Sequence, residues 1–283
     1  MPKKTAFKTL SILVSQQIDP QDPILSNVKD YLLSRGCTVY LESWLAQPSH
    51  SLVKNCDLMI VIGGDGSLLR AARLVVDHGI PILGINQGHL GFLADIQPQF
   101  FRKQLGAILD GQYQETHRFL LEVEILSDTQ SIHEIALNEI VLVSGDIARM
   151  IEYQLTLDGQ LVCTQRADGL IIATPTGSTA YALSGGGPIL HPQLDAFVLV
   201  PMFPHTLSAR PLVVSANSTL ELKVAAPRAR NLPGLTCDGL QQILLSPQAK
   251  ITIRKKAKSL RLIHPPEYQY FEVLRSKLQW QST

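Results

Sequence analysis

The sequence predicts an α/β domain followed by a sheet-rich domain. Strand and helix patterns alternate through about residue 96, short strand-like runs dominate from Arg118 onward, and helical spacing returns in Glu267–Leu278. Alternating βαβ patterns favour a parallel sheet covered by helices, whereas successive short strands favour antiparallel sheets. We therefore expect an α/β domain over residues 1–96, a connecting helix over 97–117, a sheet-rich domain over 118–264, and a C-terminal helix over 265–283 that packs back on the α/β domain.

The α/β pattern is visible segment by segment. Leu10–Ser15 is typical of a strand, and the apolar residues between Ile24 and Leu32 fall at helical spacing before Gly36, a common helix stop. The remaining segments are expected strands at Thr38–Leu41, Asp57–Ile62 and Pro81–Ile85, and expected helices at Leu68–Asp77 and Phe100–Asp110, which end at Gly79 and Gly111. The order of these segments indicates a parallel sheet.

The second half consists of short apolar runs with turn residues between them. Asp158-Gly159 is a strong hairpin signal, because both residue types accept a positive φ. The expected strands are Leu120–Leu126, Ile132–Ala136, Ile140–Val143, Ile151–Leu157, Leu161–Arg166, Leu170–Ala173, Leu220–Val224, Ile243–Leu245, Ile251–Arg254 and Leu260–Ile263.

The amino-acid composition excludes several classes of protein. The 283 residues are 45% hydrophobic and 17% charged with a net charge of +1, so neither a disordered chain nor a nucleic-acid surface is indicated. The four cysteines contain no CxxC pair, which favours reduced thiols and argues against a zinc site. Phe7–Ser15 is too short to span a membrane. We expect a cytoplasmic protein with no nucleic-acid or membrane partner and no metal cage.

The first candidate site is Gly63-Gly64-Asp65-Gly66-Ser67, between an expected strand and an expected helix. Glycines at such a turn let the backbone approach a phosphate, and the helix N-terminus presents N–H groups to it. A carboxylate among phosphates suits a general base for an attacking hydroxyl. The alternative is a tight turn in which Asp65 caps the helix.

The second candidate site is the segment Thr174–Tyr181, followed by Ser184-Gly185-Gly186-Gly187. Its five Ser and Thr hydroxyls and four glycines suit phosphate and ribose oxygens, and Tyr181 could stack on a base. The alternative is an ordinary surface loop.

Two shorter motifs complete the set. Asn138-Glu139 interrupts an apolar run, and because neighbouring strand residues face opposite sides, we expect one of the pair to face the core or a cleft. Arg166-Ala167-Asp168-Gly169 follows another expected strand. The alternatives are a bulge or internal hydrogen bond for the first motif and an ion pair or turn for the second.

In their order along the chain and in their spacing, the four motifs resemble those of the NAD kinase family, in its proteobacterial branch. Gly91-Phe92-Leu93, Pro201–Pro211 and Leu262-Ile263-His264-Pro265 extend the resemblance. It implies a Rossmann-like α/β domain, a β domain, and ATP-dependent phosphorylation of the adenosine 2′-hydroxyl of NAD with Asp65 as general base. It also implies Mg²⁺ or another divalent cation with ATP, and a homodimer or homotetramer.

The resemblance assigns site residues by position. A phosphate loop is expected at Gly63, Gly64, Gly66 and Ser67. The positions that match NAD contacts in the family are Asp65, Gly66, Arg70, Asn138, Glu139, Arg149, Arg166, Asp168, Thr179, Ala180, Tyr181, Ala182, Leu183, Ser184 and Gln241. One departure concerns Asp238-Gly239-Leu240-Gln241, where family members often have Asp-Gly-Gln. Either Gln241 or Leu240 therefore occupies the glutamine position.

Three other functions share part of this pattern. A diacylglycerol-type lipid kinase has a similar Gly-Gly-Asp-Gly turn but needs a membrane-docking face, and no basic amphipathic helix is evident. A 6-phosphofructokinase would be α/β throughout. A dinucleotide sensor would gain little from the carboxylate of Asp65, so an enzyme is favoured.

Overall fold

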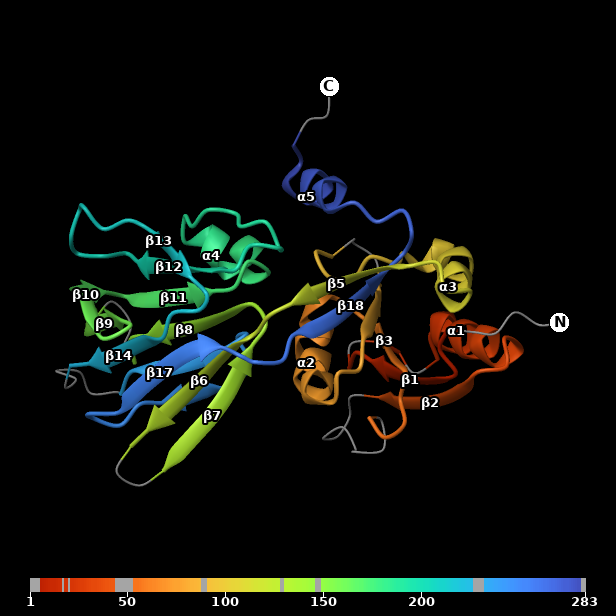
Figure 1. Cartoon of the computed structure of the whole chain (residues 1–283), viewed down its shortest axis with the longest axis horizontal. Helices are drawn as coiled ribbons and strands as arrows, with labels where there is room; N and C mark the ends of the chain where they lie inside the picture. The colour runs from red at the N-terminus through yellow and green to blue at the C-terminus, as the bar shows by residue number, and fades with distance from the viewer. Residues whose placement is uncertain are drawn as a thin grey trace. The chain divides into compact units, whose positions relative to one another are not determined.

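The computed structural model describes residues 6–16, 18–19, 21–43, 53–87, 91–127, 130–145, 149–225 and 232–280. The chain divides into two compact units. The α/β unit comprises Met1–His117 with Ser259–Thr283, and the β unit comprises Arg118–Lys258 (Figure 1). Among the described helices, none is long and apolar enough to cross a membrane.

The α/β unit is built on a largely parallel sheet. Its described strands, in spatial order, are β2 (Thr38–Ser43), β1 (Thr9–Val14), β3 (Leu58–Ile62), β4 (Ile82–Ile85), β18 (Leu260–His264) and β5 (Gln114–Arg118). Parallel pairing runs from β2 through β1, β3 and β4 to β18. All five residues of β3 are buried, which explains its unbroken apolar sequence. The predicted parallel sheet is confirmed.

Helices pack against this sheet through their apolar faces. The described helical segments are α1 (Pro23–Ser34), α2 (Asp65–Val75), the 3₁₀ turn η2 (Val76–His78), the 3₁₀ turn η3 (Pro98–Phe100), α3 (Phe101–Leu109) and α5 (Tyr270–Leu278). The Asp22 side chain accepts from Ile24 N–H at the start of α1, and Gly36 follows its end with a φ of 78°. Helices α1 and α3 share one apolar core with β1 and β3.

The β unit contains two antiparallel sheets. Within the described residues each sheet has six strands, in the orders β10-β9-β14-β17-β6-β7 and β13-β12-β11-β8-β15-β16. The strands are β6 (Leu121–Leu126), β7 (Ser131–Ala136), β8 (Glu139–Val143), β9 (Ile151–Leu157), β10 (Gln160–Ala167), β11 (Gly169–Ala173), β12 (Ala196–Met202), β13 (Leu212–Ser215), β14 (Leu220–Val224), β15 (Gly234–Cys237), β16 (Gln242–Leu244) and β17 (Lys250–Lys255). One core, which includes Ile140, Phe197 and Ile251, takes residues from both sheets. The predicted sheet-rich half is confirmed.

A short helical segment covers the outer face of the second sheet. The 3₁₀ turn η4 (Gly177–Thr179) and α4 (Tyr181–Ser184) follow β11, and Ala182 of α4 packs in a cluster with Val141 and Ile171. The motif Thr174–Tyr181 is therefore a strand-to-helix connection and not a surface loop.

Two segments belong elsewhere than we expected. We counted Leu260–Ile263 with the sheet-rich domain, but β18 pairs in parallel with β4 and lies between β4 and β5 in the first sheet. The range 97–117 was expected to be a connecting helix, but it also contains β5, the edge strand of that sheet. The expected return of the final helix is confirmed, since α5 lies in the α/β unit.

Candidate active site

The turn that follows β3 carries the first set of predicted site residues. Gly64 is the N-cap of α2, and Asp65 is its first residue. Ser67 N–H and Leu68 N–H donate to Gly64 O, so the N–H groups of Asp65 and Gly66 precede the first intrahelical bonds. The turn thus combines exposed backbone at Gly64 and Gly66 with a helix N-terminus, a combination that suits a phosphate.

The Asp65 carboxylate accepts hydrogen bonds from a loop, residues 91–94, that begins 26 residues later in the sequence. Phe92 N–H donates to Oδ2 at 2.8 Å, and Leu93 N–H and Ala94 N–H donate to Oδ1 at 3.1 and 3.3 Å. A Cβ on Gly91 would lie 2.1 Å from Oδ1, so only glycine allows this approach. The alternative in which Asp65 caps its own helix is wrong, because the carboxylate faces the 91–94 loop instead.

The 91–94 loop is held by its neighbours. Ile96 N–H donates to Gly84 O at 3.2 Å, which ties the end of the loop to β4. Asp95 pairs with Nδ1 of His264 in β18, and Nε2 of the same ring lies 2.7 Å from Thr116 Oγ1 in β5. His264 is 1% exposed. Three strands of the sheet therefore fix the backbone that positions Asp65.

In the β unit, Asn138 and Glu139 lie at the corner between β7 and β8. Asp238 accepts the N–H groups of Leu137, Asn138 and Glu139 at 2.8, 2.7 and 3.2 Å. Thr174 holds the same corner from the other side, since its Oγ1 donates to Leu137 O and its N–H to Asn138 O. Of the two alternatives for this motif, the internal hydrogen bond is therefore confirmed at the backbone of Asn138 and Glu139, which form a clamped corner.

Gly177 completes this clamp. A Cβ at Gly177 would lie 2.1 Å from Asn138 O, so the connection between β11 and α4 can pass over the corner only with glycine at this position. The clamp leaves both side chains of the Asn138-Glu139 pair outside these backbone contacts.

The Glu139 carboxyl lies in a buried environment. It is 7% exposed, and its Oε2 has no hydrogen-bond partner among the described residues. Burial and the charge of Asp238 raise the pKa of Glu139 to about 8, although the backbone N–H of Tyr181 opposes this shift. Glu139 is therefore mainly a neutral carboxylic acid at pH 7.

The hydroxyl-rich segment after β11 serves the fold more than we expected. Ser178 Oγ donates to Pro175 O and accepts from Leu190 N–H, and Thr179 Oγ1 donates to Thr176 O. Together with Thr174, these hydroxyls satisfy backbone groups. Of the predicted 179–184 contacts, the Tyr181 ring and Ser184 are exposed, whereas Ala182 is buried in the core.

The remaining predicted residues lie on separate elements. Arg70 is exposed on α2, Arg149 is exposed before β9, and Arg166 is exposed on β10. Arg166 is exposed and Asp168 is half-buried, with the buried Ala167 between them. Leu240 and Gln241 are both exposed within the β15–β16 turn.

Sequence reasoning named three residues within motifs but missed that they position the site. Asp238 and Thr174 hold the Asn138-Glu139 corner, and His264 holds the loop under Asp65. The Asp238-Gly239 pair was a usable signal, since both residues have a positive φ, 54° and 65°, as hairpin turns favour. In the described part of the chain, no group of three or more His, Cys, Asp or Glu side chains could hold a metal ion.

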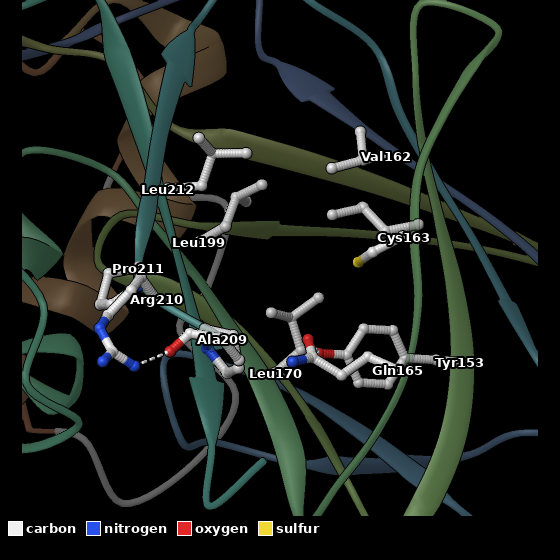
Figure 2. Close-up of a pocket in the computed structure, with 12 residues that line it drawn as sticks. Tyr153, Val162, Cys163, Gln165, Leu170, Leu199, Ala209, Arg210, Pro211 and Leu212 are labelled. Atoms are coloured by element: carbon white, nitrogen blue, oxygen red, sulfur yellow. Dashed lines mark hydrogen bonds between the residues drawn. The ribbon is translucent and has the colours of Figure 1, made fainter. Parts of the chain in front are cut away.

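A separate pocket of about 280 Å³ lies in the β unit and contains none of the predicted site residues. Figure 2 shows apolar side chains such as Leu170, Leu199 and Leu212 around it, with Tyr153 and Gln165 at one side. The Tyr153 hydroxyl donates to Gln165 Oε1 at 3.0 Å, so these polar groups satisfy each other. Arg210 also lines the pocket, and its guanidinium donates to Leu207 O and Ala209 O at 2.8 and 2.7 Å.

Comparisons with known protein families cover most of the chain. Residues 26–113 match the family described as ATP-NAD kinase N-terminal domain, and residues 137–265 match the ATP-NAD kinase C-terminal domain. The NAD kinase of Pseudomonas entomophila (strain L48) is 49% identical over 269 residues, covering 91% of this chain and 90% of that protein. The NAD kinase of Pseudomonas fluorescens (strain Pf0-1) is 51% identical over 267 residues, covering 90% of each.

Solved structures share the fold. Yeast NADH kinase complexed with NADH superposes with a TM-score of 0.84 at 23% identity, covering 98% of this chain and 89% of that one. An NAD kinase from Archaeoglobus fulgidus in complex with ATP gives a TM-score of 0.74 at 29% identity, covering 94% and 99%. The similarity extends over both units.

Proposed function

The chain belongs to the NAD kinase family, and on that premise we propose that it transfers the γ-phosphoryl group of ATP to the adenosine 2′-hydroxyl of NAD, with Asp65 as general base. ATP-dependent phosphorylation of NAD is the activity of this family. The choice of hydroxyl and of base is our own inference, and it depends on the surroundings of Asp65.

The observation that carries the proposal is the hydrogen bonding of the Asp65 carboxylate. A carboxylate has about four lone-pair sites, two on each oxygen. Oδ1 accepts two backbone N–H groups and Oδ2 accepts one, so within the described residues one site on Oδ2 is left for a further donor. A substrate hydroxyl is such a donor. We infer that Oδ2 accepts the proton as the hydroxyl oxygen attacks the γ-phosphorus and the bond from that phosphorus to the β-phosphate oxygen breaks.

The β unit supplies the groups that would recognise NAD. The exposed Tyr181 ring suits a base, and the Asn138-Glu139 pair suits ribose hydroxyls and the adenine edge. Arg149 and Arg166 suit diphosphate oxygens, because guanidinium groups bind phosphate through paired N–H donors. We propose that Asp168, the 179–184 segment and Gln241 contribute further contacts.

The ATP phosphates suit the turn that carries Gly63, Gly64, Gly66 and Ser67. A divalent cation such as Mg²⁺ would enter with ATP, because no described residue group forms a metal cage and Mg²⁺ usually retains waters and substrate phosphates as ligands. When bound, the cation would neutralise phosphate charge. We further propose that the enzyme works in the cytoplasm as a homodimer or homotetramer.

Product identity tests this proposal. The protein is incubated with ATP, Mg²⁺ and NAD, and the product is examined by NMR for phosphorus coupling to the proton at the adenosine 2′ position. We expect NADP and ADP in equal amounts. A product phosphorylated at another hydroxyl, or ADP without phosphorylated NAD, would refute the assignment. Replacing NAD by a diacylglycerol or a hexose phosphate should give no product.

A further inference from the structure

Asp238 is a carboxylate that packs directly against a proposed NAD-contact pair without being one of the assigned contacts. It is 8% exposed and accepts three backbone N–H groups, those of residues 137–139. Its own N–H donates to Glu139 O at 2.9 Å, so the turn and the corner are bonded in both directions. Three N–H donors on one carboxylate favour its ionised form.

Glu139 faces this charge on the outer side of the second sheet. Alternation along β8 places Glu139 on the same side as Val141, which packs with Ala182 of α4, whereas Ile140 faces the core between the sheets. Of the described elements of the β unit on this side, α4 brings the backbone N–H of Tyr181 to Glu139. The β15–β16 turn brings Asp238, and β11 brings no titratable group.

We propose that Asp238 is the positioning residue of the Asn138-Glu139 pair and that burial, together with the charge of Asp238, keeps Glu139 a neutral carboxylic acid in the enzyme that receives NAD. This inference rests on the proposed function, because it assigns Glu139 to the dinucleotide. It goes further by stating the protonation state in which Glu139 binds and the residue that acts with burial to maintain that state.

The chemistry of the ligand favours the neutral form. NAD carries an anionic diphosphate, so a second negative charge beside Asp238 would oppose its binding. A protonated carboxyl donates one hydrogen bond and still accepts others, and therefore it can satisfy both a ribose oxygen and a ribose hydroxyl. Burial, the absence of a partner for Oε2 among the described residues, and the pKa of about 8 all agree with this state.

The test is the pH dependence of NAD binding by titration calorimetry on the full chain, between about pH 6.5 and pH 9, where NAD itself does not titrate. We expect wild-type affinity to be constant at low pH and to fall above about pH 8, approaching tenfold per pH unit, because the competent fraction falls tenfold per unit above the pKa. Glu139→Gln keeps a neutral side chain, so its affinity should be independent of pH.

The Asp238→Asn variant distinguishes a positioning role of Asp238 from a role in folding alone. Removing the neighbouring charge lets Glu139 ionise more easily, so the fall in affinity should begin at lower pH than in the wild type. Hydrogen exchange at residues 137–139 should also become faster, because the amide cannot accept all three N–H groups. Glu221→Gln in β14, a half-buried carboxylate paired with Lys250, is the matched control and should keep the wild-type profile.

Four results would overturn the inference. They are a flat wild-type profile, an affinity that rises with pH, a Glu139→Gln variant that retains the wild-type profile, or an unshifted profile in Asp238→Asn. Failure of the wild type to bind NAD at any pH would refute the proposed function itself, and is therefore distinguishable from failure of this inference. If Asp238→Asn does not fold, the comparison of Glu139→Gln with the wild type still tests whether ionisation of Glu139 weakens NAD binding.

Discussion

The carboxylate of Asp65 meets two demands that compete. It binds three backbone N–H groups of the 91–94 loop, and in the proposed mechanism it must still accept a proton from the substrate. The two demands fall on different lone pairs, since the loop leaves one site on Oδ2. A residue in this position therefore has to be an anionic acceptor, and an amide of the same shape cannot replace it.

We predict that Asp65→Asn lowers the rate of NADP formation by roughly 10²–10⁴-fold, which is typical of losing a general base. The structure adds a second expectation, because the new NH₂ group would face a loop N–H group, and stability should fall by about 1–3 kcal/mol. Steady-state kinetics and thermal unfolding measure the two effects. Asp30→Asn, at an exposed position in α1, is the matched control. Turnover within threefold of wild type would contradict the role of Asp65.

The raised pKa of Glu139 predicts that the stability of the folded protein depends on pH. Its pKa is about 8 in the folded protein against an ordinary value of 4.5, so between these values the folded state binds more protons than the unfolded state. The free energy of unfolding should therefore decrease as pH rises, from full stabilisation below about 4.5 to none above about 8, with a limit of about 5 kcal/mol. Urea unfolding of the β unit measures it.

Glu139→Gln should remove this slope, because the amide is neutral throughout. The variant should gain stability relative to wild type at pH values above about 8 and lose that advantage in mild acid. Identical slopes for the two proteins would show that Glu139 does not titrate in this range.

At the scale of elements, the 91–94 loop links the α2 turn to three strands. Its residues bond to Asp65, and the residues just after it bond to β4 and to His264 of β18. The loop has no regular secondary structure, but its backbone is as well anchored as that of a strand. Its conformation should therefore determine where the Asp65 carboxylate lies.

We predict that Gly91→Ala impairs turnover and stability together. The added Cβ would lie 2.1 Å from Asp65 Oδ1, so either the loop or the carboxylate must move. We expect kcat to fall by about 10²-fold, as small displacements of catalytic groups do. The control is Gly36→Ala, where nothing lies within 4 Å but φ is 78°, so stability should fall while turnover is unchanged. Equal turnover in the two variants would contradict the role of the loop.

Elements with clear periodicity were predictable from the sequence, and elements without it were not. Two features follow from local chemistry, namely the helix stop at Gly36 and the hairpin at Asp158-Gly159. Both are confirmed by positive φ values. Strand β5 (Gln114–Arg118) was missed because its sequence has no apolar alternation. Strands β12, β13 and β15 were missed as well, since proline and small residues flank or interrupt them.

The same limit applies to the candidate site. Motifs identified Asp65, Asn138 and Glu139, because glycine-rich turns and polar residues in apolar runs are local signals. The residues that hold them, Asp238 and His264, are about 100 residues or more away in sequence from the groups they fix. Such contacts depend on strand order, which a single sequence does not contain.

At the scale of the whole molecule, the α/β unit is discontinuous in sequence and the β unit is inserted into it. The β unit has its own core, all of whose members lie between residues 121 and 253. The α/β unit instead needs β18, which lies between β4 and β5. The two units should therefore differ in their ability to fold alone.

We predict that a fragment spanning residues 118–258 folds cooperatively, whereas a fragment spanning 1–117 does not. The first retains both sheets and their shared core, whereas the second lacks the strand that joins β4 to β5. Far-UV circular dichroism and thermal unfolding of each fragment distinguish the cases. A cooperative transition in the 1–117 fragment would contradict the importance of β18.

The insertion of β18 also orders events during synthesis of the chain. The ribosome completes the β unit before β18, the strand between β4 and β5, has emerged. His264, which anchors the loop under Asp65, arrives with that strand. A polypeptide released before β18 can therefore fold the β unit, to which we propose to assign dinucleotide recognition, but cannot complete the α/β unit that carries Asp65. Catalytic competence in this architecture therefore requires that translation has passed β18.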